Sequence, residues 1–449
     1  MGGQLRCRAM SMVFLSTLLI YDSQQPVATP SRPKRQRSGS LLRNLCQGGQ
    51  VHHFVTELLH PRRLSLLKSA VFSIQMEHYE QIVTYEILAS LLTKVALQKQ
   101  GASRLVDSGL VNKLASSSFL DDYPEQSREL EAAFSVNRSS RYFQLLNPTL
   151  QLISALLTTM SENKPLRSAS TLFLLHHRDV VFKVFEAAVQ VARPEDTKGY
   201  YYHAHSTSNP SIAASLEAAK LITGMLVTLM RVEPSDDDQI KKFFRDLLEK
   251  DNGIKWMLKV LTPALKPSYQ QASHLSLSPE GDGGDTNATF SGTKGTSAAA
   301  VAEPDNLILV YEILRNICLI CCSRQSEYKV LGRGADVHGY ARYGQGRDIK
   351  KQPVVDLGVM IEVLRHMPEN LGGAEKLGVQ QGLMKDKYRK NLCFQMIEST
   401  LPVMFYHLKH VRDDKRARAN VRQILDRLEN IVRSTGGLPK QSAEFMETL

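Results

Sequence analysis

The sequence has few cysteines, and they do not form a pattern that predicts disulfide bonds. Small domains that depend on disulfides carry densely and regularly spaced cysteines. Here six cysteines are spread over 449 residues, isolated or inside an apolar run: Cys7, Cys46, Cys318, Cys321, Cys322 and Cys393. We therefore expect a protein of a reducing compartment.

The N-terminal region lacks an apolar run long enough to cross a bilayer. Residues 10–20, MSMVFLSTLLI, are eleven in number, whereas a membrane-spanning helix needs about 20. Arg6 and Arg8 precede this run, as in a secretory signal, but no small-residue cleavage site follows it. A targeting signal remains an alternative, and the pattern favours a buried helix and a chain with no membrane span.

No complete metal site can be assembled from the sequence. Cys318, Cys321 and Cys322 form a C-x-x-C-C pattern, and a C-x-x-C pair can supply two ligands of a tetrahedral zinc ion. The other two ligands are missing, since only the isolated Cys393 and distant histidines remain. The three cysteines lie among Ile, Leu and Val, so we expect them to pack as small hydrophobic side chains. We predict no metal.

Motifs for catalysis are also missing. His176, His177 and Asp179 resemble an acid–base cluster, but adjacent residues on a helix point about 100° apart. We expect the histidines to end one helix and Asp179 to be the N-cap of the next. The Gly- and Arg-rich residues 332–351 contain no P-loop and no GxGxxG, so we expect a surface loop, with RNA or a protein partner as alternative contacts. We predict no catalytic residue, no cofactor, no small-molecule substrate and no enzyme.

What the sequence does contain is helical periodicity. Apolar residues recur at i, i+3 and i+4 in most segments, while no alternating strand pattern exceeds four or five residues and no fixed repeat period is found. Residues 51–98 predict two or three helices. Further helices are predicted at 166–175, 179–192, 212–231, 234–248, 306–322, 354–365, 389–411 (interrupted by Pro402) and 417–433. The fold class is therefore all-α.

Residues 142–160, YFQLLNPTLQLISALLTTM, are apolar on more than one side. Asn147-Pro148 is a good N-cap and first-turn pair, so we expect the helix to begin there. One apolar stripe would consist of Leu150, Ile153, Leu157 and Met160, and a second of Leu152 and Leu156. A helix with two such stripes can contact both its own pair and the next repeat, as in a stacked solenoid. We predict an irregular HEAT/armadillo-like α-solenoid with disordered insertions.

The composition changes along the chain and indicates domain boundaries. Residues 268–304 contain Ser, Gly, Thr, Ala and Asp but hardly a bulky apolar residue, so we expect a disordered insertion. An N-terminal apolar helix and basic flexible segment (1–50) would precede an α-solenoid (51–267). A helical C-terminal part (305–449) would follow the insertion and include the Gly/Arg-rich loop at 332–351.

Basic residues outnumber acidic ones by 56 to 45, which gives a net charge of +11. The excess is concentrated, with five basic and no acidic residues at positions 31–44. Such a cluster suggests an acidic partner or an address signal more than a nucleic-acid-binding domain. Arg32, Lys34, Arg35 and Arg37 form a possible nuclear-address segment, and a solvated basic linker is the alternative.

Residues 141–189, RYFQLLNPTLQLISALLTTMSENKPLRSASTLFLLHHRDVVFKVFEAAV, carry a family resemblance. A leucine-rich helix, a polar break, a helix ending in a His-Arg turn and another apolar helix follow in the order that resembles the giant α-helical scaffold nucleoporins of the nuclear pore inner ring. The resemblance implies the C-terminal part of a longer protein, located at the nuclear envelope in the nuclear pore complex.

This resemblance also implies a function. The chain would be a structural, non-catalytic constituent of the pore that supports nucleocytoplasmic transport and binds other nucleoporins, both scaffold and linker subunits. The alternative is a soluble HEAT/armadillo-like adaptor or a nuclear transport receptor. Import receptors of that class tend to be acidic because they hold basic cargo, and a charge of +11 argues against them.

Overall fold

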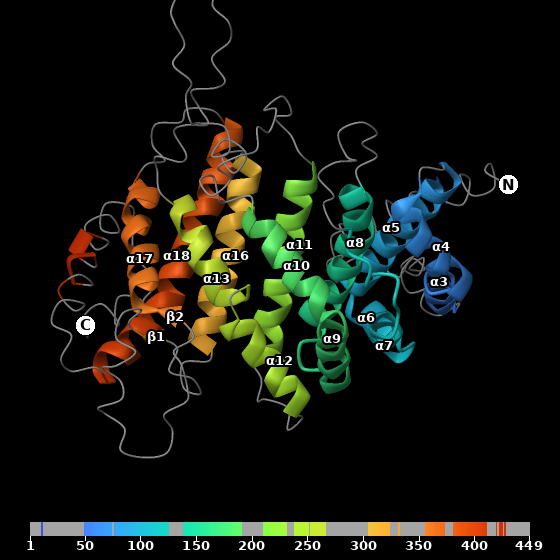
Figure 1. The fold of residues 1–449 in the computed structure, drawn as a ribbon, viewed down its shortest axis with the longest axis horizontal. Helices are drawn as coiled ribbons and strands as arrows, with labels where there is room; N and C mark the ends of the chain where they lie inside the picture. Colours follow the sequence, from blue (N-terminus) through green and yellow to red (C-terminus); the bar gives the residue numbers. More distant parts are fainter. Residues whose placement is uncertain are drawn as a thin grey trace, which may run out of the picture. The chain divides into compact units, whose positions relative to one another are not determined.

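The described part of the chain is almost entirely α-helical (Figure 1). The computed structural model describes residues 10–11, 49–73, 76–124, 138–190, 210–230, 238–250, 252–265, 304–323, 331–332, 355–372, 380–410, 419, 422–424 and 426–427. Within these residues the one extended element is a parallel pair of two-residue strands, β1 (Leu331–Gly332) and β2 (Val355–Asp356). The predicted all-α fold class is confirmed.

The chain divides into two compact units. The first comprises residues 1–184, 217–229 and 235–243, and the second comprises residues 185–216, 230–234 and 244–449. Three helices, α10 (Arg178–Gln190), α11 (Pro210–Met230) and α12 (Asp238–Glu249), contribute residues to both units.

The first unit is built around two long helices that pack against each other, α5 (Met76–Ala96) and α8 (Arg138–Thr159). α4 (Pro61–Phe72) packs on both, and α3 (Gln50–Leu58) packs on α5 and α6 (Lys99–Asp107). α7 (Leu110–Ala115) packs on α9 (Lys164–His176). The region 51–98, for which two or three helices were expected, forms three.

The second unit is centred on α16 (Pro304–Ser323) and α18 (Gln380–His410), which pack side by side. α17 (Leu357–Gly372) packs on α18 and on the 3-10 turn η1 (Thr262–Leu265), which follows α13 (Ile254–Leu261). The buried Asn370 fixes this last contact, because its Nδ2 donates to the carbonyls of Leu265 (2.9 Å) and His366 (2.8 Å).

The predicted start of α8 at Asn147-Pro148 is wrong. α8 begins at Arg138 and continues through Pro148. A proline inside a helix removes one backbone hydrogen bond and costs about 3 kcal/mol. Tyr142 and Leu145 precede the proline and are fully buried, and burying one large apolar side chain contributes about 1.5–3 kcal/mol. Tertiary packing of the first turns therefore outweighs the proline.

In the second unit, the predicted interruption of a helix at Pro402 is also wrong. The sequence predicts an interruption there, but α18 runs through it without a break. Leu401 and Val403 on either side of the proline are buried, so packing again holds the helix on both sides.

Both predicted stripes of α8 lie in the core. Leu150, Leu152, Ile153, Leu156 and Leu157 are all buried. Met160 lies just beyond the end of the helix and is half-buried. α8 packs on α4, α5, α6 and α9, which explains why it needs apolar residues over a wide arc.

α11 is the one described helix that is long and apolar enough to cross a membrane, over Ile212–Met230. The core helix of a soluble protein can have the same length and composition. None of its described side chains is classed as exposed, and Leu216, Ala219, Ile222 and Leu226 are fully buried within the protein. Burial of this extent is expected of a core helix.

Several predicted segments lie wholly or mostly outside the described residues. Of the apolar run 10–20, Met10 and Ser11 are described, and both are helical. The insertion 268–304 is represented by Pro304, where α16 begins, and the loop 332–351 by Gly332 in β1.

Candidate functional site

The structure describes some, but not all, of the residues to which the sequence assigned a possible functional role. Arg32, Lys34, Arg35 and Arg37 of the possible nuclear-address segment lie outside the described residues. Their role therefore stays a prediction.

The cysteines of the C-x-x-C-C pattern and Cys393 all lie in the second unit. Cys318, Cys321 and Cys393 are buried and Cys322 is half-buried. Burial raises the pKa of Cys318 to about 11 and that of Cys393 to about 12, so both stay protonated at neutral pH, whereas metal ions bind the thiolate. In the described part of the chain no group of three metal-ligating side chains is found. The structure thus agrees with thiols that pack as hydrophobic side chains.

The histidine pair occupies the junction of α9 and α10. α9 ends at His176, and His177 is its C-cap, with the backbone N–H donating to the carbonyl of Phe173 at 3.1 Å. The carbonyl of His177 in turn accepts from the N–H of Val181 at 3.0 Å. α10 begins at Arg178, so the prediction that Asp179 is the N-cap is wrong, and Asp179 lies in the first turn. An acid there still complements the helix dipole.

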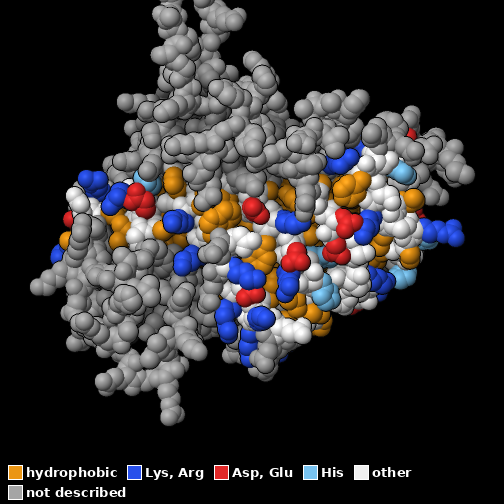
Figure 2. All heavy atoms as spheres, viewed as in Figure 1, with side chains coloured by type: hydrophobic (Ala, Val, Ile, Leu, Met, Phe, Trp, Pro, Cys, Tyr) orange, Lys and Arg blue, Asp and Glu red, His pale blue; other side chains and the backbone are white. Residues whose placement is uncertain are grey.

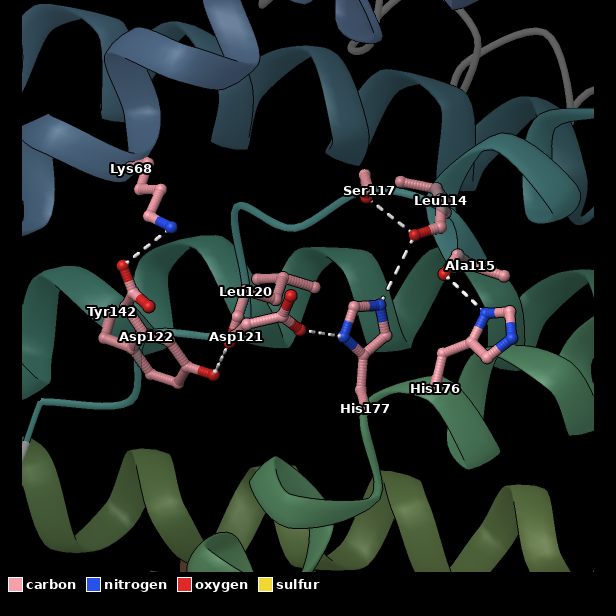
Figure 3. Close-up of polar contacts among 10 residues, drawn as sticks. All are labelled: Lys68, Leu114, Ala115, Ser117, Leu120, Asp121, Asp122, Tyr142, His176 and His177. Carbon is pink, nitrogen blue, oxygen red and sulfur yellow. Dashed lines mark hydrogen bonds and ion pairs between the residues drawn. The ribbon is translucent and has the colours of Figure 1, made fainter.

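The two histidine side chains reach back to the segment that follows α7 (Figure 3). His177 Nδ1 lies 2.8 Å from Asp121 Oδ1, and its Nε2 lies 3.4 Å from the carbonyl oxygen of Leu114. His176 Nδ1 lies 3.0 Å from the carbonyl oxygen of Ala115. The two carbonyls belong to the last turn of α7, where the regular helical partners are missing, and the Leu114 carbonyl also accepts from the N–H (3.2 Å) and the hydroxyl (2.6 Å) of Ser117. The histidines therefore bind a helix end.

Two further side chains hold the same segment from other helices (Figure 3). Tyr142 of α8 donates its hydroxyl to the carbonyl of Leu120 at 2.6 Å. Lys68 of α4 forms an ion pair with Asp122, with Nζ 3.0 Å from Oδ2. We call residues 114–122, together with the side chains of Lys68, Tyr142, His176 and His177, the polar clasp.

The surroundings of Tyr142 inside the polar clasp keep its hydroxyl uncharged. Its ring makes edge contacts with Tyr123 and Phe143, at centroid distances of 5.1 and 5.9 Å. Burial raises the pKa of Tyr142 well above its ordinary value, and the nearby Tyr123, Asp121 and Asp122 raise it further. The hydroxyl therefore stays protonated and acts as a fixed hydrogen-bond donor.

Arg141, the residue before Tyr142, anchors α8 to the end of α4. Its side chain is buried and donates to the backbone carbonyls of Ala70 (3.3 Å) and Ser73. Its guanidinium also lies 5.4 Å from the ring centroid of Tyr79. Basic groups near the C-terminal carbonyls of a helix are favourable.

The polar clasp was missed by the sequence interpretation. The signal that could have found it is the presence of Arg141, Tyr142 and the histidine pair inside otherwise apolar helices, because buried polar groups need partners. The partners are mostly backbone carbonyls, which no side-chain pattern reveals. Chemically, the clasp links helix ends, so its role is to fix how helices pack.

This clasp, α3 to α9 and residues 141–189 all lie in the half of the chain that matches a known family. Residues 1–230 match the nuclear pore complex scaffold family of nucleoporins 186/192/205 (Nup192). The chain belongs to this family. The match covers just over half of the 449 residues. No curated protein matches the sequence.

Family membership confirms the function inferred from residues 141–189. The chain is a scaffold nucleoporin, a non-catalytic component of the nuclear pore complex. Its partners are accordingly other components of the pore. This outcome also decides against the alternative of a soluble adaptor or transport receptor.

Proposed function

We propose that this Nup192-family chain stands in the inner ring of the nuclear pore and stacks its helices as an irregular α-solenoid. In this arrangement the faces and edges of the helices bind neighbouring scaffold and linker nucleoporins. The observation that carries the proposal is α8, whose two apolar stripes are buried apart from the half-buried Met160 beyond its end and whose neighbours are linked by the polar clasp. A helix that is packed on several sides is what a stacked fold requires.

The proposal includes an order of parts along the chain. Residues 51–267 would form the solenoid, and residues 305–449 a second helical part beyond the insertion at 268–304. The chain would correspond to the C-terminal part of a longer scaffold nucleoporin. Sequencing of the transcript upstream of the Met1 codon tests whether the chain is part of a longer protein. An in-frame region that encodes further helices supports this proposal, and in-frame stop codons contradict it.

Location in the inner ring is tested by proximity labelling in cells. The chain, tagged with a biotin ligase at its own locus, should give a punctate nuclear rim and label inner-ring scaffold and linker subunits more strongly than outer-ring or basket subunits. A freely diffusing ligase is the control for random labelling. Diffuse fluorescence, or preferential labelling of outer-ring subunits, would contradict the proposal.

The same cells test the nuclear-address segment. Replacing Arg32, Lys34, Arg35 and Arg37 by alanine should lower nuclear accumulation of a reporter fused to residues 1–50, because an acidic receptor groove needs these charges. The matched control exchanges Arg for Lys and Lys for Arg at the four positions and keeps the charge. Equal accumulation of both variants would show that the segment is a basic linker.

A further inference from the structure

A close turn in the second unit joins the C-terminal half of α12 to α13. The N–H of Gly253, just before α13, donates to the carbonyl of Lys250 at 2.9 Å. A Cβ atom at Gly253 would lie 2.3 Å from the carbonyl oxygen of Leu247, so no other residue fits without movement. This close approach fixes the end of α12 against the start of α13.

The two helices that this turn joins are both strongly amphipathic. Phe244, Leu247 and Leu248 of α12 are buried, as are Ile254, Met257, Leu258 and Leu261 of α13. Arg245, Lys255 and Lys259 are exposed. We call these three cations the basic face. Figure 2 shows Lys and Arg side chains gathered over the segment that Figure 1 labels α12.

The three cations of the basic face form no ion pair with the residues that the structure describes. Nearby Lys250, by contrast, has a partner, since its Nζ lies 3.3 Å from Asp246 Oδ2. Lys255 and Lys259 are one helical turn apart, about 6 Å along the axis. Exposed cations that have no partner among the described residues can pair with carboxylates in an acidic segment of another chain.

The side chains around the basic face favour an acidic protein segment, and not a membrane or a single-stranded nucleic acid, as the partner. Membrane-surface helices insert apolar side chains beside their cations, and single-stranded nucleic acids stack on exposed aromatic rings. Among the described residues the large exposed apolar side chains are Met10, Leu66, Phe72, Leu97 and Tyr388. None of these belongs to α12 or α13.

We propose that the basic face of α12 and α13 docks an acidic, Asp/Glu-rich linear segment of a neighbouring nucleoporin. This inference rests on the proposed scaffold function and adds the chemistry of one partner. The attraction is electrostatic and lies at the surface, so it weakens as added salt shortens the Debye length.

A charge-reversal variant of the full-length chain tests the basic face, with Arg245→Glu, Lys255→Glu and Lys259→Glu combined. The probe is a fluorescent twelve-residue Asp/Glu-rich peptide, whose binding is measured by anisotropy at low and physiological salt. We expect the variant to bind the probe about tenfold more weakly or worse, because three attractive charges become repulsive. Circular dichroism checks that the helices are retained.

The matched control reverses one arginine and two lysines of the first unit, Lys99→Glu, Arg104→Glu and Lys113→Glu. These residues are exposed on α6 and α7, and the control has the same net charge as the test variant. The proposal requires the control to bind the peptide as the unchanged chain does. Equal weakening of peptide binding in both variants would show that only the net charge of the chain matters, and it would overturn the proposal.

Two further probes, phosphatidylserine-containing vesicles and single-stranded RNA, test the other possible partners. Selective loss of binding to phosphatidylserine-containing vesicles or to single-stranded RNA, with peptide binding unchanged, would overturn the proposal in favour of that surface. In cells, cross-linking mass spectrometry should show α12 or α13 linked to an acidic segment, lost in the test variant while the nuclear rim remains. If the unchanged chain gives no rim, the proposed location fails irrespective of the basic face.

Discussion

Asp121 and Asp122 are adjacent residues of the polar clasp with similar exposure, at 48% and 46% of their side-chain surface, but their partners differ. Asp121 binds His177, whose side chain is 4% exposed, whereas Asp122 binds Lys68, which is 44% exposed. Removing a partner from a buried polar group costs about 1–3 kcal/mol, while an exposed ion pair contributes about 0–1 kcal/mol. Burial of the partner thus decides which aspartate matters.

We therefore predict that Asp121→Ala weakens the polar clasp more than Asp122→Ala does. In hydrogen exchange, peptides that cover residues 114–122 should open about tenfold more often in Asp121→Ala, which corresponds to about 1.4 kcal/mol. Asp122→Ala is the matched control, and we expect its exchange to change less than threefold. Equal effects of the two substitutions would show that His177 is held by the packing of its ring, which lies 4.7 Å from the ring of Phe173.

At the scale of elements, α8 connects the local sequence to the packing of the first unit. Tyr85 of α5 and Thr149 of α8 share a hydrogen bond of 2.6 Å, and the Thr149 hydroxyl donates to the carbonyl of Leu145 at 2.7 Å. The second bond spans Pro148, where the backbone has no N–H to donate, and the first ties the same turn of α8 to α5. The helix on both sides of the proline is therefore part of one packed element.

This continuity predicts similar costs for truncations on either side of Pro148. Leu145→Ala and Leu152→Ala remove fully buried side chains and should each lower the free energy of unfolding of the first unit by about 2–5 kcal/mol. Leu97→Ala is the control, since Leu97 is 55% exposed, and should change it by less than about 0.5 kcal/mol. Urea unfolding followed by circular dichroism measures all three. A small effect of Leu145→Ala alone would indicate that the helix is packed only after the proline.

The sequence predicted where helices exist much better than where they begin. The helix predicted at 166–175 exists as α9 but begins at Lys164, where the Asn163 side chain caps it by accepting from the N–H of Leu166 at 2.8 Å. Asn147-Pro148 gives a similar signal and fails, since buried residues upstream extend the helix. The polar clasp could not be predicted, because His177 and Asp121 are distant in sequence and periodicity describes only local structure.

At the scale of the whole molecule, the charge of +11 coexists with ionisable side chains that are kept neutral in both units. In the first unit burial raises the pKa of Tyr85 and Tyr142. In the second unit burial raises the pKa of Cys318 and Cys393 above their ordinary value of 9.0. Each of these groups favours folding in its protonated form.

The sign of the pH dependence follows from these raised pKa values. Below about pH 8.5 the thiols are protonated in both the folded and the unfolded chain, so the stabilisation is fully present. Above pH 9 the unfolded chain loses protons that the folded chain keeps, until pH reaches about 11 for Cys318 and about 12 for Cys393. Each thiol then lowers the free energy of unfolding by about 1.4 kcal/mol per pH unit.

We predict that the urea midpoint of the second unit is constant from pH 7 to 8.5 and falls steadily from pH 9 to 10.5. The double variant Cys318→Ala and Cys393→Ala should show a shallower fall, because two of the groups responsible are gone, even if its midpoint at pH 7 is lower. Site-resolved unfolding, by hydrogen exchange of peptides from α16 and α18, separates this unit from the rest of the chain. A midpoint that stays constant to pH 10.5, or the same slope in the double variant, would mean that these thiols reach solvent in the folded protein, and α16 and α18 would then pack less closely than they do here.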